Sequence, residues 1–218
     1  MYNASTYKKA AFECFSNAKS LHDEACLLAN SGYAHRAAAL AIIGLEEFAK
    51  AIAYTLAALL PGKEHILANC DQLRIHEVKH LVTASAEAAE IETHDYRLVV
   101  SQDAGFPLTE RERLEILFHW LVKHDVAGVV SDSEGAKRFF RELRMDPTHS
   151  LPVPDVKNAA LYVDIGPGGE VHTPSRIQER AASAILGLEW FLDVYAALPI
   201  VLEDNAAWGN FVLRIHGP

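Results

Sequence analysis

The chain carries no excess of positive charge. Its 20 Lys and Arg residues are outnumbered by 29 Asp and Glu residues, and the formal net charge is −9 at pH 7. Proteins that bind nucleic acid over a broad surface carry a basic patch, so this composition argues against such a surface. It does not argue against a small cleft that acts on RNA.

Cysteine is scarce as well. Cys14, Cys26 and Cys70 are an odd number and form no Cys-x-x-Cys pair. They favour reduced thiols in a cytoplasmic protein. The first residues contain no charged segment followed by an apolar run and a cleavage site, so we expect no signal peptide.

A membrane span is not expected either. Residues 37–60 have the necessary length, but Glu46, Glu47 and Lys50 lie near the centre of this stretch. Each charge would cost about 2.5–3.5 kcal/mol on insertion scales, and the flanks show no Lys/Arg bias. We therefore expect a buried helix of a soluble bundle and no membrane partner.

Long linkers and low-complexity segments are also missing. Half of the 218 residues are hydrophobic, so we expect a single domain over 1–218 with a substantial core. The periodicity of the apolar residues predicts an all-α bundle of long antiparallel helices. The predicted helices cover about 5–29, 33–60, 64–94, 109–126, 134–143 and 175–205, and Thr109 and Glu112 have the spacing of a capping box.

One segment is expected to be non-helical. Three prolines fall within residues 146–158, and two β-prone runs, LYVD and EVHT, then flank a Gly-Pro-Gly-Gly turn. This pattern predicts one small β-hairpin at about 160–173. Tyr162 and Asp164 share one face of its first strand, which either packs and caps the turn or closes over a helical site.

Two segments of the chain resemble each other. AALAIIGLEEF (38–48) aligns with AASAILGLEWF (181–191), which pairs Gly44 with Gly187 and Glu46 with Glu189. The similarity is either compositional, or it marks two central helices that approach closely at the glycines and bring two glutamates into one region.

Charged residues on the second predicted helix form a narrow group. Glu46, Glu47 and Lys50 fall in a wedge about 100° wide, with Lys50 between the acids and able to pair with both. The group is either a solvated stripe or a desolvated cluster that serves a site or a specific contact.

The third predicted helix carries a second polar group. His76, Lys79 and His80 lie within about 100° of one another, and Thr83 and Glu87 extend this face. Two histidines four residues apart suit metal binding, proton transfer or phosphate contacts, and they also suit a polar outer face.

The order of these motifs resembles a known family. LEEFAK on an apolar helix, HEVK on the next, and ALYVD after a proline-rich connection resemble the AbiV-type abortive infection proteins of the HEPN superfamily. The matching residues are Glu46, Glu47, Lys50, His76, Lys79, Tyr162 and Asp164. The resemblance implies a helical bundle, frequent homodimerisation and a role in anti-phage defence.

The resemblance also implies a chemistry. Many HEPN relatives are metal-independent endoribonucleases with an arginine followed, after four to six residues, by a histidine, supplied by both protomers. The spacing is met by Arg74/His80, Arg113/His119 and Arg144/His149. On a regular helix Arg74 and His80 lie about 120° apart, whereas Arg144 and His149 straddle Pro147 and could converge in a loop.

Three hypotheses follow. The first is a homodimeric defence toxin that acts on RNA without metal or cofactor, with a phage-encoded protein as a trigger; its candidate site is His76, Lys79, His80, Glu46, Glu47 and Lys50, extended by Arg144, His149, Tyr162 and Asp164. The second is a non-catalytic bundle whose charged cluster fixes a dimer or senses a phage protein. The third is a ferritin-like di-metal bundle using Glu77 and His80 with Glu46 and Glu189.

Overall fold

The computed structural model describes residues 3–60, 62, 76–126, 128, 133–143, 164–165, 171–172 and 178–216. Helices account for most of these residues, as the apolar periodicity predicts. They are α1 (Ala4–Asn30), α2 (Ala34–Leu59), α4 (His76–Ala104), α5 (Glu110–Lys123), α7 (Ser133–Glu142), α9 (Gln178–Val194), α10 (Leu198–Glu203) and α11 (Asn205–His216).

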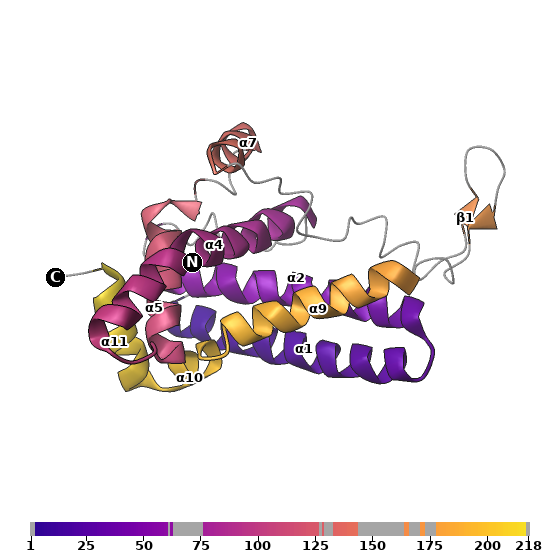
Figure 1. Ribbon diagram of the computed structural model, residues 1–218, viewed down its shortest axis with the longest axis horizontal. Helices are drawn as coiled ribbons and strands as arrows, with labels where there is room; N and C mark the ends of the chain where they lie inside the picture. The colour runs from indigo at the N-terminus through magenta and orange to yellow at the C-terminus, as the bar shows by residue number, and fades with distance from the viewer. Residues whose placement is uncertain are drawn as a thin grey trace.

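Long helices form the body of the molecule. α1 and α2 pack along each other as a hairpin, and α9 lies against both (Figure 1). α4 lies against another side of α2 and also contacts α5. The short helices α10 and α11 pack against α1 and α5 and close one end of the bundle.

The hairpin of α1 and α2 has clear boundaries in the sequence. The Asn3 side chain caps α1 by accepting a hydrogen bond from the Thr6 amide at 2.9 Å. The predicted break at Asn30–Gly32 is confirmed, since Gly32 has a φ of +83°, a value that favours glycine.

A cluster of aromatic rings joins the helices in the core. Phe48 of α2 is fully buried, and its ring centroid lies 4.8 Å from that of Phe191 and 5.2 Å from that of Tyr195. Phe15 adds a contact from α1. Tyr195 is also fully buried and donates its hydroxyl hydrogen bond to the Ala86 carbonyl of α4 at 3.1 Å. The rings therefore fix α1, α2, α4 and the end of α9 relative to one another.

α4 extends further than the sequence predicts. The predicted end near residue 94 is wrong, because the helix continues to Ala104. No residue between 95 and 104 breaks a helix, and the chain leaves it at Gly105, which has a φ of +75° and precedes Pro107 by two residues. The predicted start near residue 64 lies outside the described residues.

α5 begins as predicted. The Thr109 side chain accepts a hydrogen bond from the Glu112 amide, and the Glu112 carboxylate accepts one from the Thr109 amide at 2.9 Å, so the capping box is confirmed. The hydrogen bonds that the Thr109 amide and hydroxyl donate to the carboxylate lower the pKa of Glu112.

The predicted final helix over 175–205 is wrong in its extent. Three helices replace it: α9 ends at Val194, α10 follows, and α11 runs on to His216. Pro199 lies in the first turn of α10, where a proline needs no amide donor. Asp204 then caps α11 by accepting a hydrogen bond from the Ala206 amide at 2.7 Å.

The structure describes four residues of the predicted hairpin region. Asp164–Ile165 (β1) pairs antiparallel with Val171–His172 (β2), and Asp164 lies opposite His172. The rest of the predicted span of about 160–173 lies outside the described residues, so a wider hairpin stays a prediction.

Two further expectations from the sequence concern a membrane span and the state of the cysteines. Among the helices of the described ranges, none combines the length and the apolar character that a bilayer crossing requires. Cys14 and Cys26 are free thiols, and Cys70 lies outside the described residues.

Candidate functional site

Glu46 forms an ion pair between two helices. Its Oε2 atom lies 2.7 Å from Nζ of Lys79, which joins the middle of α2 to the first turn of α4. The side chains of Lys79 and Glu46 are only 7% and 13% exposed. Because both charges have lost most of their water, their contact offsets part of the cost of burying them.

Glu47 lies on the side of α2 that faces α1. It pairs with Lys50, one turn further along α2, and the side chains of Glu47 and Lys50 are 16% and 28% exposed. The Cys14 thiol of α1 lies beside this pair. Burial, followed by the negative charge of Glu47, raises the pKa of Cys14 to about 12.

The predicted arrangement of the three charges is therefore corrected. Lys50 pairs with Glu47, and Glu46 reaches across to Lys79 of α4. Adjacent residues on a helix are about 100° apart, which is enough to aim two carboxylates at two different neighbouring helices. The group contains two ion pairs with different environments, one between helices and one within α2.

The environment of Cys14 makes its thiol unreactive. At pH 8 a thiol with a pKa of about 12 is ionised in about one molecule in ten thousand, and only the thiolate is alkylated. We expect Glu47→Gln to lower this pKa and to speed alkylation of Cys14 by iodoacetamide several-fold, measured by mass spectrometry. Cys26 is the internal control, because the charges beside it are Glu189 and Asp23. An unchanged rate at Cys14 would show that Glu47 does not act on the thiol.

The two candidate histidines lie on the backbone of α4 next to the buried ion pair. His76 is the first described residue of the helix, three residues before Lys79, and His80 directly follows Lys79. Their side chains, and that of Glu77, are outside the described part of the structure. The Glu46–Lys79 pair therefore fixes the turn of α4 that carries both histidines against α2.

Two further polar residues continue along this side of α4. Thr83 is buried, and its hydroxyl donates to the Lys79 carbonyl at 3.0 Å. Glu87 follows one turn later, and its buried Oε2 atom has no hydrogen-bond partner among the residues that the structure describes. Polar groups thus extend for more than two turns from the candidate site.

The Arg-x5-His pair on α5 does not converge. Arg113 lines a groove with His94 and Arg97, whereas His119 lines a different groove with Trp120. Arg113 and His119 are six positions apart on the helix, so their side chains leave it in directions about 120° apart. Arg74, Arg144 and His149, from the other two pairs, lie outside the described residues.

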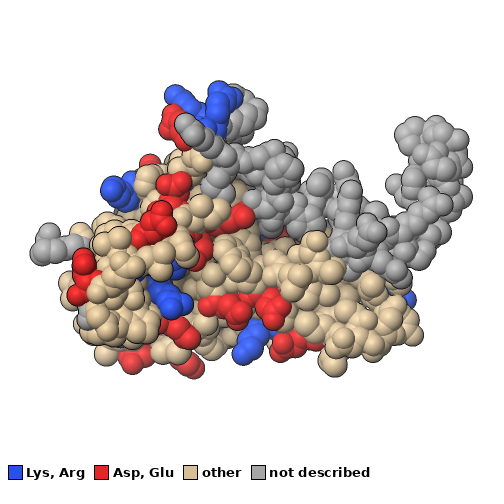
Figure 2. Space-filling model, in the orientation of Figure 1, with Lys and Arg blue, Asp and Glu red and all other residues tan. Residues whose placement is uncertain are grey.

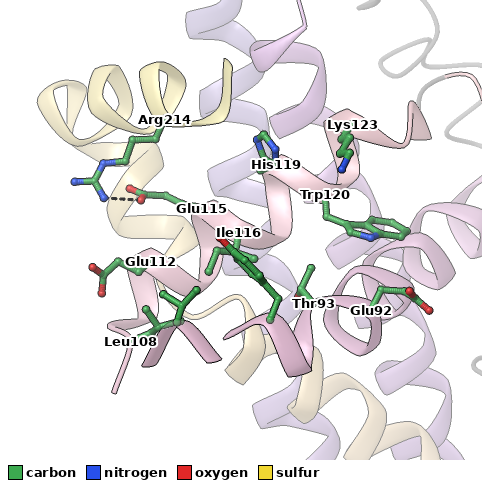
Figure 3. Close-up of a pocket in the computed structure, with 12 residues that line it drawn as sticks. Glu92, Thr93, Leu108, Glu112, Glu115, Ile116, His119, Trp120, Lys123 and Arg214 are labelled. Carbon is green, nitrogen blue, oxygen red and sulfur yellow. Dashed lines mark hydrogen bonds and ion pairs between the residues drawn. The ribbon is translucent and has the colours of Figure 1, made fainter. Parts of the chain in front are cut away.

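Sequence reasoning overlooked the groove that contains His119. It lies between α4, α5 and α11, has a volume of about 660 Å³, and is lined by residues that include Tyr96, Lys123 and Arg214 (Figure 3). The available signal was the four-residue spacing of His119 and Lys123, which places both on one face of α5.

The two similar segments, 38–48 and 181–191, differ in how closely other helices approach their glycines. A Cβ atom at Gly44 would collide with Leu188 Cδ2 and lie 3.4 Å from the Ala18 carbonyl oxygen, so a close approach at Gly44 is confirmed. The same prediction for Gly187 is wrong for the described residues, because none of them from another part of the chain has an atom within 4 Å of a Cβ there.

The expectation that the two aligned glutamates share a region is also wrong. Glu189 is exposed and lines a groove between α1 and the α9–α10 segment, with Asp23, Asp193 and Glu203. Acidic side chains gather over this part of the molecule in Figure 2. Glu46 is buried against α4, because its helix contacts α4 on one side and α9 on another.

The metal-binding hypothesis gains no ligand set from the described residues. Among them, no three or more His, Cys, Asp and Glu side chains are grouped so that they could hold a metal ion. Glu46 is paired with a lysine, and Glu189 lies elsewhere. Tyr162 and the side chain of Asp164 lie outside the described part.

Comparisons with known proteins bear on the family of this chain. Searches of curated proteins and of solved structures found no significant match. The family model HEPN_AbiV, described as AbiV, matches residues 6–188, a range that contains both ion pairs of α2 and the start of α4. Since the match covers most of the chain and the structure is a helical bundle, this chain belongs to the AbiV-type family of abortive-infection HEPN proteins.

Proposed function

We propose that this chain is an abortive-infection effector that cleaves RNA as a cytoplasmic homodimer, with residues 1–218 acting as one domain. His76 and His80 exchange protons with the substrate. The observation that carries this proposal is the buried Glu46–Lys79 pair, whose lysine lies between the two histidines in the sequence. Buried charge next to potential acid–base groups is typical of a functional site.

In this proposal one histidine accepts the proton of a ribose 2′-hydroxyl as its oxygen attacks the adjacent phosphorus. The other histidine donates a proton to the 5′-oxygen, whose bond to phosphorus breaks. The products are a 2′,3′-cyclic phosphate and a free 5′-hydroxyl. The reaction needs no metal, since both proton transfers use imidazole groups.

Lys79 and Glu46 are positioning residues. The Lys79 ammonium is buried and already held by a carboxylate, so it orients α4 rather than contacting a phosphate. Glu47 and Lys50 hold α2 beside α1. We assign the stabilisation of the phosphorane charge to Arg144, and we add His149, Tyr162 and Asp164 as further residues of the proposed site.

Purified full-length protein is expected to cleave single-stranded RNA in the presence of EDTA. His76→Ala and His80→Ala should each lower the rate by about 10²- to 10⁴-fold, the usual contribution of acid–base catalysis. The readout is gel electrophoresis of end-labelled RNA. His94→Ala, which removes an exposed histidine further along α4, is the control and should keep the wild-type rate. Intact RNA with the wild-type protein, or full activity in His76→Ala, would contradict the proposal.

A non-catalytic role is the second candidate. It is supported by the pairing of both α2 carboxylates within one chain, which satisfies their charges without a substrate. Such a bundle would recognise a phage-encoded protein or a second copy. It would arrest growth of cells that express it even when His76 and His80 are both replaced by alanine, whereas the RNA-cleaving effector would not.

A further inference from the structure

One side of α4 carries apolar residues along most of its length, and we call these residues the α4 stripe. On a regular helix their positions fall within a wedge about 100° wide, so they form a single continuous face. The members of the stripe are Leu81, Ala84, Ala88, Ile91, Leu98 and Val99.

The beginning of the α4 stripe is covered by α7. Ala84 is fully buried in a cluster with Ala136 and Phe140 of α7, and Leu81 and Phe139 pack against the same cluster. The apolar side of a short helix therefore already binds one part of this face within the chain itself.

The second half of the α4 stripe is exposed. Ile91 is 52% exposed, Leu98 49% and Val99 54%. Ile91 and Val99 differ by eight positions, a rise of about 12 Å, which is enough for about two turns of another helix. Neighbouring exposed apolar side chains of this kind are typical of a surface that binds a partner.

The charges around this exposed half are negative. Glu92, Asp95 and Asp103 are all exposed. Arg97 is the only Lys or Arg in residues 91–104, and its side chain is 11% exposed and paired with the Glu90 carboxylate. A partner that covers the apolar residues would therefore meet acidic side chains at the edge of the contact.

This charge pattern does not suit a second copy of the chain. Two copies packed through the α4 stripe would bring Glu92 and Asp95 of each copy towards the same acids of the other, and each copy has a net charge of −9. The helix α7 has the pattern that does suit the stripe, because Arg138 and Arg141 are exposed while its apolar side is buried.

We propose that the exposed half of the α4 stripe binds an amphipathic helix of another protein, one that carries Lys or Arg beside its apolar face. The apolar side chains of that helix lie on Ile91, Leu98 and Val99, as in other complexes where a helix is held by residues one and two turns apart. Its cations lie at Glu92 and Asp95. The partner helix thus continues along α4 from the part that α7 occupies, and the proposal does not depend on RNA cleavage.

Binding to the full-length protein can be measured by fluorescence anisotropy with two labelled peptides of about 14 residues. Both have leucine at helical spacing, and the remaining positions are lysine in one peptide and glutamate in the other. We expect the lysine peptide to bind with a Kd below about 100 μM and at least about tenfold more tightly than the glutamate peptide. Added salt should weaken the lysine peptide, because the acidic side chains are exposed.

Leu98→Asp should weaken the lysine peptide at least about tenfold, because it replaces an apolar contact with a charge. Leu213→Asp is the matched control: it adds the same charge at a leucine of α11 that is 69% exposed and lies outside the stripe, and it should leave the Kd within about twofold. Asp95→Asn should weaken binding several-fold, whereas Asp23→Asn, which changes an exposed acid of α1, should not.

Equal binding of the lysine peptide by folded Leu98→Asp and Leu213→Asp proteins would overturn the proposal, since the peptide would then respond only to overall charge. No binding by the wild-type protein would overturn it as well. Sedimentation tests the other occupant: a dimer that Leu98→Asp disrupts and Leu213→Asp does not would identify a second copy on the stripe and contradict the proposal. His76→Ala should bind the lysine peptide as the wild type does, which separates this result from the RNA-cleavage test.

Discussion

Lys79→Met is expected to lower the free energy of unfolding by about 3–5 kcal/mol, the usual cost of removing one partner of a buried ion pair. The variant keeps the length of the side chain and leaves the Glu46 carboxylate buried without its lysine. Urea unfolding followed by circular dichroism measures the change. The effect should be large because both side chains are mostly shielded from water.

Two variants isolate the charge effect. The double variant Glu46→Leu/Lys79→Met replaces the pair with apolar groups and should recover most of the lost stability, since it removes both buried charges. Lys50→Met removes the cation of the more exposed pair with Glu47 and should cost about 1 kcal/mol or less. Equal losses in Lys79→Met and Lys50→Met would contradict the distinction between the two pairs.

Phe48→Ala is expected to lower the free energy of unfolding by about 3–5 kcal/mol, because it opens a cavity among buried rings. Phe48 contacts Phe15, Phe191 and Tyr195, so the loss falls where α1, α2 and α9 meet. Urea unfolding is again the measurement.

Phe106→Ala is the matched control for Phe48→Ala. It removes the same atoms from a ring that is largely exposed after α4, and it should change stability by about 0.5 kcal/mol or less. A loss in Phe48→Ala as small as that in Phe106→Ala would contradict the position of Phe48 in the core.

The helices with clear end signals were predictable from the sequence. Asn30–Gly32 separates α1 from α2, and Thr109 with Glu112 begins α5. Where the signal was ambiguous the prediction was wrong: Pro199 lies in the first turn of α10, a separate helix, although the apolar pattern continues across it. Periodicity identifies helices well, but it does not tell whether an apolar run belongs to one helix or to two.

The partners of the charged residues were less predictable. Helical spacing placed Glu46, Glu47 and Lys50 on one wedge, and it permitted Lys50 to pair with either acid. The spacing could not identify which neighbouring helix lies beside each of these residues. Glu46 pairs with Lys79 because α4 packs against α2. A spacing gives angles on one helix, whereas an ion pair between helices depends on the tertiary fold.

The groove at His119 illustrates the same limit. Its lining comes from three helices that are distant in the sequence, and α11, which supplies the Ile215 carbonyl and Arg214, falls beyond the helices that the sequence predicts. The groove could therefore be found only after α11 had been placed against α5.

In the proposed function, Glu46 and Lys79 hold the histidines of α4 in place and take no part in the chemistry. The most direct test is the rate of RNA cleavage by four full-length proteins: wild type, Lys79→Met, Glu46→Leu/Lys79→Met and His76→Ala. We predict that Lys79→Met is at least about tenfold slower than wild type, that the double variant returns to within about tenfold of it, and that His76→Ala is about 10²- to 10⁴-fold slower. A double variant as inactive as His76→Ala would contradict the account, and so would a wild-type protein that leaves RNA intact.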